Sequence, residues 1–210
     1  MSLRQCGPGG ARAAAAAQAA VAQGAKALVS WGIAGGLAPD AAPGTLLLPK
    51  VVVTPDGARF RADEAWHSRL AGALGRQFSV LDRPLLAGGD VLRTPARKAE
   101  AAAAHGAAGV DLESGSVAAA AARAGVPFVV VRAVADAATD TLPAGIEDWI
   151  DDDGNPRFAA VAGAALKPQY WPALWMLAQR YRTARRTLDA AALALVPEAF
   201  SFRQDALLGV

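Results

Sequence analysis

Short apolar segments alternate with alanine-rich segments along this chain, and this alternation limits the folds that it can adopt. The most strand-like segment is FVVVRAVA at residues 128–135, which stops at Asp136. We predict strands over residues 27–31, 45–54, 78–86, 109–111 and 128–135, and helices over residues 11–23, 63–74, 94–105 and 113–124. Strands that alternate with helices predict an α/β fold of three layers, with helices on both faces of a mixed, largely parallel sheet.

Prolines and glycines mark where several of these elements begin, break or end. Pro49 and Pro84 lie inside two predicted strands and should break them or leave them at a sheet edge. Thr94 and Pro95 are typical of an N-cap and a first helical residue. Gly24 is expected to end the first helix in a left-handed conformation.

Size and composition limit the number of cores and the kinds of partner. With 210 residues, 53% of them apolar, we expect a single domain over residues 1–210, of which 145–210 form a helical C-terminal extension. A formal net charge of +2 argues against nucleic acid as a partner. The single cysteine, Cys6, suits a reducing cytoplasm. Every apolar run is shorter than the roughly 18 residues that cross a bilayer.

Three candidate ligand-binding segments directly follow predicted strands, where open α/β sheets bind their ligands. They are a glycine-rich loop expected at residues 32–36, the segment from Asp111 to Ser114, and Asp136. Each also has a purely structural explanation. The glycines would form a tight turn, Glu113 would be a carboxylate at a helix N-terminus, and Asp136 would cap the next element.

The sequence predicts no metal site. His67 lies on a predicted helix and His105 at a helix end, so we expect surface or helix-dipole roles for both. The acidic segment at residues 151–156 lacks the later bidentate glutamate of a calcium loop, and we interpret it as a solvated turn.

Three stretches together resemble the superfamily of nucleoside phosphorylases and nucleosidases. They are LVSWGIAGGLAPDAAPGTLLLP, AGGDVL and VDLESGSVAAAAARAGVPFVVVRAVAD, and they extend from residue 27 to residue 136 in the order of that family. The SWGIAGGL form, the alanine-rich helix and the long C-terminal extension are most similar to the hopanoid-associated branch. The resemblance implies a phosphorylase/hydrolase-like fold that assembles as a homo-oligomer.

The resemblance also implies a reaction, which is cleavage of the N-glycosidic bond of an adenine nucleoside with a bulky, adenosylhopane-like 5′ group. Asp136 matches the general acid that protonates the base at N7, and Glu113 matches the glutamate that binds the ribose hydroxyls. No organic cofactor is implied, and phosphate is a possible co-substrate. The implied substrate-binding residues are Ile33, Ala34, Gly35, Val91, Leu92, Leu112, Glu113 and Ser114.

Two departures from the family concern the group that attacks the sugar. The family's first strand is expected to be missing, because the matching segment begins near Cys6. Ile33 replaces a serine or threonine that contacts phosphate or ribose in many members. Arg93, Lys98 and Arg132 are alternative cations, although each also suits a structural role. A catalytically impaired nucleoside- or lipid-binding protein, or an oligomeric scaffold, therefore remains an alternative to the enzyme.

The C-terminal region carries aromatic and basic residues at helical spacing. These residues are Tyr170, Trp171, Trp175, Tyr181 and Arg185. Such a helix could lie on a membrane surface, which would suit a lipidic nucleoside. From the sequence we favour the alternative that it packs against the domain or another subunit.

Overall fold

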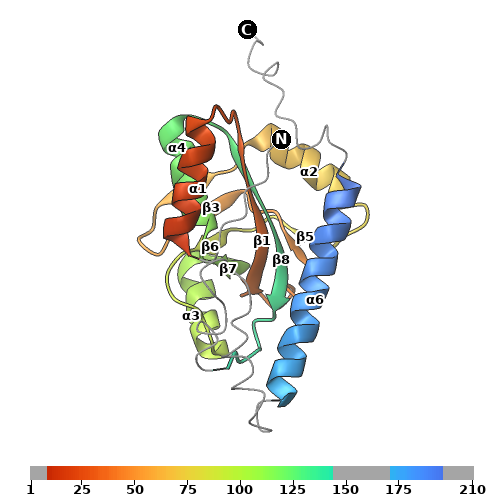
Figure 1. The fold of residues 1–210 in the computed structure, drawn as a ribbon. Coiled ribbons are helices and arrows are strands. Elements are labelled where there is room, and N and C mark those ends of the chain that lie inside the picture. Colours follow the sequence, from red (N-terminus) through yellow and green to blue (C-terminus); the bar gives the residue numbers. More distant parts are fainter. Residues whose placement is uncertain (1–8, 144–170, 196–210) are drawn as a thin grey trace.

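The structure, a computed structural model, describes residues 9–143 and 171–195, and these form helices around one mixed sheet (Figure 1). The helices are α1 (Gly10–Ala22), α2 (Glu64–Leu74), α3 (Pro95–His105), α4 (Ser114–Ala124) and α6 (Trp171–Ala194). The strands are β1 (Leu28–Gly36), β2 (Leu46–Leu47), β3 (Val51–Val53), β4 (Arg59–Arg61), β5 (Val80–Leu81), β6 (Leu85–Ala87), β7 (Gly109–Asp111) and β8 (Phe128–Asp136).

Strands β1 and β8 form the centre of the sheet, whose order is β4-β3-β6-β7-β1-β8-β2-β5. They run parallel along their whole length, from Leu28 opposite Phe128 to Gly35 opposite Asp136. On the other side of β1, the antiparallel strand β7 pairs with it only at Gly35 and Gly36. The pairing of β1 with β7 is short because β7 has only three residues and ends at Asp111. The three-layer mixed α/β fold predicted from the sequence is confirmed.

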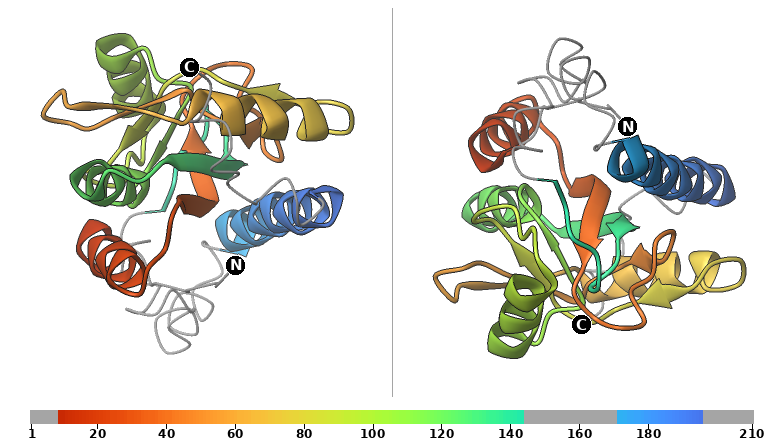
Figure 2. Two further views of the ribbon diagram at one scale, coloured as in Figure 1. Left: turned by 90° about the horizontal axis from the view of Figure 1, so that it is seen from above. Right: turned by 90° about the horizontal axis from the view of Figure 1, so that it is seen from below.

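The two faces of β8 are buried against different helices. Val130 and Val134 belong to the apolar cluster that contains alanines of α1 and α4. Val129 and Val131 belong to a second cluster with residues of α2 and α6. Side chains of a strand alternate between its faces, so an unbroken apolar run indicates a strand that is covered on both sides. Figure 2 shows α1 and α6 lying apart, with the central strands between them.

Several local signals in the sequence are confirmed. Strand β2 ends before Pro49 and β3 begins after it, and Pro84 separates β5 from β6. Helix α3 has Thr94 as its N-cap, whose side chain accepts a hydrogen bond from the Arg97 amide at 3.3 Å. Gly24 takes the expected left-handed conformation, with φ of 88°.

Two expectations are wrong. Residues 32–36 are not a loop, because β1 continues to Gly36. Over these residues it pairs with β8 as far as Gly35 and with β7 at Gly35 and Gly36. His67 is not on the surface. Its side chain is buried under α2, where Nε2 lies 2.8 Å from the carbonyl oxygen of Leu48. A histidine can occupy the inner side of a helix when one buried carbonyl satisfies its ring.

Some expectations fall on parts of the chain outside the described residues. They concern Cys6, the acidic segment at residues 151–156, and Tyr170. Within the described ranges, no helix is long and apolar enough to cross a bilayer. That the family's first strand is missing stays a prediction.

The close approach of backbone at Gly36 gives a test of the fold. A Cβ at Gly36 would clash with the carbonyl oxygen of Ala41 and approach that of Asp136 to 3.0 Å. We expect Gly36→Ala to lower the free energy of unfolding by about 1–3 kcal/mol, as overpacking does elsewhere. Gly72→Ala is the matched control, because Gly72 lies exposed on α2 with open space around it. Urea denaturation should show Gly72→Ala unchanged or about 0.5–1 kcal/mol more stable. Equal stability of the two variants would contradict the packing described here.

Candidate functional site

A buried arginine, Arg132 on β8, holds together the first group of polar residues. Its Nε lies 2.6 Å from Oδ2 of Asp111, and its Nη2 lies 3.4 Å from Oε2 of Glu113. The guanidinium also donates to the hydroxyl of Ser30 at 2.9 Å and to that of Ser114 at 3.2 Å. We call these five residues the Arg132 cluster. A buried guanidinium needs such a set of acceptors, because an unpaired buried charge costs several kcal/mol.

A glycine on β1 leaves room for the guanidinium of this cluster. Gly32 of β1 is the register partner of Arg132, and any side chain at Gly32 would collide with the guanidinium. The carbonyl oxygen of Ile33 accepts a further hydrogen bond from Arg132 Nη1 at 3.4 Å. Gly32, the first glycine in the sequence WGIAGG, thus leaves space for Arg132 of the neighbouring strand.

Asp111 is the most deeply placed carboxylate of the cluster. Burial raises its pKa, and the charge of Glu113 adds to the rise, while Arg132 and the hydrogen bonds from Ser114 oppose it. Ser114 donates its hydroxyl to Asp111 Oδ2 at 2.5 Å and its amide to Oδ1 at 3.2 Å. Ser114 is itself fully buried, and its hydroxyl contacts Asp111 and Arg132 within the cluster.

Glu113 connects the cluster to α1. It occupies the N-cap position of α4 but makes no side-chain capping hydrogen bond there. Its Oε1 instead accepts the Gly9 amide at 3.0 Å, and its Oε2 faces Arg132. The Glu113 side chain stays 18% exposed. It is therefore a fixed, charged acceptor that a ligand can still reach.

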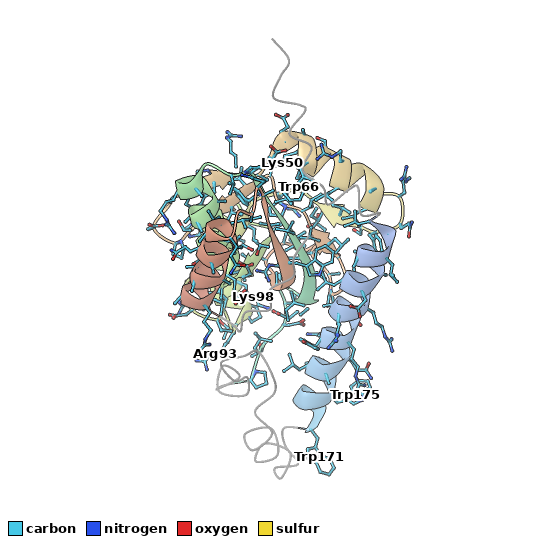
Figure 3. The ribbon with its side chains drawn as sticks, turned by 45° about the horizontal axis from the view of Figure 1, so that its top comes forward. Lys50, Trp66, Arg93, Lys98, Trp171 and Trp175 are labelled. Carbon is cyan, nitrogen blue, oxygen red and sulfur yellow. The ribbon has the colours of Figure 1, made fainter. Side chains whose placement is uncertain are left out.

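A second group surrounds Asp136 at the carboxyl end of β8. Asp136 Oδ2 forms an ion pair with Nζ of Lys98, which also donates to the carbonyl oxygen of Ala137 at 2.6 Å. The Lys98 side chain is only 1% exposed, and Figure 3 shows it pointing into the molecule. On the other side of Asp136 lies Gly35, where an added Cβ would be 3.3 Å from Oδ2.

A register shift in the β1–β8 pairing positions Asp136. Ala34 is opposite Val134, but Gly35 is opposite Asp136, so Ala135 is an extra residue on β8. Such bulges change the direction of the side chains that follow them. Ala135 joins the α6 side of the core, and Asp136 is left beside Gly35 and Lys98.

The segment after β8 ties this group to α6. Asp140 accepts the Ala137 amide at 2.6 Å and forms an ion pair with Arg180 of α6. A cavity of about 10 Å³ beside Asp136 is lined by residues 141–143 and by Met176, Leu177 and Arg180. This volume suffices for about one water molecule.

Opposing effects act on the proton affinity of Asp136. Burial is the largest and raises its pKa, and the charge of Asp140 acts in the same direction. The hydrogen bond and the charge of Lys98 lower the pKa, and Arg180 lowers it slightly further. The net direction is upward from the ordinary value of an aspartic acid.

The other predicted site residues lie in or beside the apolar core. Ala34 packs in the core, while Val91 and Leu92 lie half-buried between β6 and α3, with Leu92 against Leu37 and Leu86. Leu112 is half-buried between Asp111 and Glu113. Within the described ranges, no three His, Cys, Asp or Glu residues are grouped so as to hold a metal ion.

The sequence analysis missed the pairing of Lys98 with Asp136, although a signal existed. Lys98, Ala101 and Ala102 fall on one side of α3 at spacings of three and four residues, and the two alanines pack against the core. A lysine on that side of a helix needs a buried acceptor. The same reasoning applies to Arg132, which lies in a strand that is otherwise apolar and therefore needs a buried carboxylate.

Comparison with known proteins gives a family and a fold. The model of the phosphorylase superfamily matches residues 1–167. The S-adenosylhomocysteine nucleosidase of Streptococcus pyogenes, solved with 5-methylthiotubericidin, is similar in structure, with a TM-score of 0.68 at 18% identity over 90% of this chain and 75% of that one. The 5′-methylthioadenosine/S-adenosylhomocysteine nucleosidase of Neisseria meningitidis gives 0.67 at 18% identity, covering 90% and 77%.

A futalosine hydrolase mutant of Helicobacter pylori gives a TM-score of 0.63 at 18% identity, covering 90% of this chain and 78% of that one. At such identities the likeness shows a common fold. No curated protein matches the sequence.

The Arg132 cluster predicts a large effect on stability. Arg132→Met leaves Asp111 buried without its cation, so we expect the free energy of unfolding to fall by about 3–5 kcal/mol. Arg83→Met, which breaks the exposed ion pair with Asp40, should cost less than about 1 kcal/mol. Thermal or urea unfolding of both variants measures the difference. A loss for Arg132→Met no greater than for Arg83→Met would rule out the cluster as a stabilising centre.

Proposed function

Because this chain belongs to the phosphorylase superfamily, we propose that it cleaves the N-glycosidic bond of an adenine nucleoside. Family membership makes it an enzyme of the nucleoside-cleaving class. The names of two similar structures support adenine as the base, since 5′-methylthioadenosine and S-adenosylhomocysteine are both adenine nucleosides. The single cysteine supports a cytoplasmic location.

The observation that carries the proposal is the buried pair of Lys98 and Asp136 at the end of β8. Adenine is a poor leaving group unless N7 is protonated, so the reaction needs an acid that keeps a proton near neutral pH. Burial raises the pKa of Asp136 towards this range. Nζ of Lys98 is in direct contact with Asp136 Oδ2, so a change at Lys98 acts directly on this carboxyl group.

The proposed step begins with proton transfer from the Asp136 carboxyl to N7 of adenine. The bond between C1′ and N9 then breaks with its electron pair on the base, and the ribose becomes an oxocarbenium-like cation. Glu113 accepts hydrogen bonds from the 2′- and 3′-hydroxyls and stabilises the developing charge. Its ion pair with Arg132 and its hydrogen bond from Gly9 hold that carboxylate in place. Water then adds to C1′ and releases one proton to solvent, or a phosphate oxygen adds to C1′ directly, and Asp136 takes up a proton from solvent before the next turnover.

We further propose that the substrate carries a large apolar 5′ group and that water is the group that attacks the sugar. Ile33, half-buried among apolar residues, supports a substrate with a large apolar 5′ group such as an adenosylhopane-like nucleoside. Arg132 is already paired with two carboxylates, which supports water over phosphate as the attacking group. Incubation with and without phosphate decides between water and phosphate. Hydrolysis releases the free 5′-substituted ribose, whereas phosphorolysis releases the corresponding ribose 1-phosphate.

A second candidate is a protein that binds nucleosides without cleaving them. The observation that favours it is the ion pair of Lys98 with Asp136, because Lys98 lowers the pKa of Asp136 and so opposes the donation of a proton to the base. Calorimetry with adenosine analogues, combined with an assay for free adenine, separates the two candidates. Heat of binding without release of base would favour the binding protein.

The role of Asp136 predicts the effect of its replacement. Asp136→Asn cannot donate a carboxyl proton, so adenine release from 5′-methylthioadenosine or a longer 5′-substituted analogue should fall by about 10²–10⁴. Asp82→Asn, at an exposed ion pair with Lys50, is the control and should keep full activity. Adenine is measured by chromatography under saturating substrate. An undiminished rate in Asp136→Asn would remove Asp136 as the acid.

The role of Lys98 predicts a shift in the pH profile. The active form carries a protonated Asp136, so activity should decline as pH rises through the pKa of this group. Lys98 lowers that pKa, so Lys98→Met should raise it and move the declining limb to higher pH. Lys50→Met, which removes an exposed lysine paired with Asp82, should leave the limb in place. If Lys98→Met stays folded and active with an unmoved limb, Lys98 does not control the proton on Asp136.

A further inference from the structure

The outward side of α6 carries large apolar side chains exposed to solvent. Trp171 is 59% exposed, Trp175 68% and Leu193 89%. Figure 3 shows both tryptophans projecting from the end of α6, away from the central strands. Exposed tryptophans are uncommon on a helix whose other side is well packed. This side of α6 therefore needs an explanation other than the fold itself.

Helical spacing separates the two sides of α6. The buried residues Ala184, Leu188 and Ala191 recur every three or four positions and face the core with α2 and β8. At 100° per residue, the opposite side carries one continuous stripe. The outward stripe consists of Trp171, Trp175, Arg182, Arg186, Asp189 and Leu193.

The outward stripe and its border are positively charged. Arg182, Arg185 and Arg186 are all exposed, and Asp189 is the single acidic residue in the α6 sequence. Arg180 is not part of this surface, because it forms an ion pair with Asp140. Tryptophan together with arginine on one side of a helix is the composition of helices that lie in the headgroup region of anionic membranes.

We propose that the outward stripe of α6 binds the surface of a membrane that contains anionic lipids. The tryptophans enter the boundary between headgroups and acyl chains, and the arginines bind lipid phosphates. The contact does not depend on the proposed reaction. It would nevertheless place Asp136 close to the lipid surface, because Met176, Leu177 and Arg180 of the same end of α6 line the cavity beside Asp136.

A second copy of this chain fits the outward stripe less well than a membrane does. In a contact with two-fold symmetry, the middle of the stripe meets the same residues of the other copy. Here Arg182 and Arg186 lie in the middle, between tryptophans at one end and Leu193 at the other. Such a contact would bring arginines against arginines. Anionic lipid headgroups are complementary to the same arrangement.

Cosedimentation of the full chain with lipid vesicles tests the proposal. The protein should bind vesicles of phosphatidylcholine mixed with phosphatidylglycerol, and it should bind pure phosphatidylcholine much more weakly. The double substitution Arg182→Glu with Arg186→Glu should weaken binding to the mixed vesicles by roughly twenty-fold or more. Trp175→Ala should weaken binding to both kinds of vesicle.

The matched control is Arg69→Glu with Arg76→Glu, which makes the same change in charge at exposed positions on and just after α2. It should retain most of the binding, and circular dichroism confirms that each variant is folded. Absence of binding to the mixed vesicles, or equal losses in the two double variants, would overturn the proposal. So would a dimer of the unmodified chain that is lost in Arg182→Glu with Arg186→Glu, since that result assigns the stripe to a second copy.

Discussion

The positive charge of Arg132 in the middle of the sheet is the constraint on which the surrounding structure depends. Its guanidinium is satisfied only because β7, β1 and the start of α4 each bring an oxygen to it. The lack of a side chain at Gly32 leaves the space that this one group occupies. Replacement of a buried ionic cluster by apolar side chains of similar volume is often neutral or stabilising, so stability alone does not account for the cluster, whereas holding Glu113 in place does.

The two polar groups are centred on one strand, and the proposed reaction gives each of them a different role. Arg132 and Asp136 lie four residues apart on β8, and the extra residue Ala135 between them changes the direction in which Asp136 points. The Arg132 cluster holds a carboxylate fixed and charged. In the proposed reaction Asp136, which is in contact with Lys98, carries the proton that is transferred. A fixed acceptor for the sugar and a transferable proton for the base are what cleavage of a nucleoside requires.

The sequence predicted the elements better than the contacts between them. Alternating apolar and alanine-rich segments, with proline and glycine at their ends, placed β8, α3 and α4 to within a residue or two. The glycines at 32–36 were misread as a loop, because a glycine that gives space to an arginine of another strand resembles a glycine of a turn. The burial of His67 and the ion pair of Lys98 were not predicted, because each side chain is satisfied by a distant acceptor, the Leu48 carbonyl or Asp136, which no local pattern identifies.

The pairing of β1 with β8 also determines the order in which this protein can fold. Ser30 and Arg132 are 102 residues apart in sequence, although their side chains are in contact. During synthesis β1 emerges long before its main partner, β8. Ser30 and Gly32 cannot make their contacts with Arg132 until β8 has been made. Pairings so distant are slow to form, and the unpaired strand is exposed meanwhile. We therefore expect the Arg132 cluster to be among the last parts of the molecule to become native.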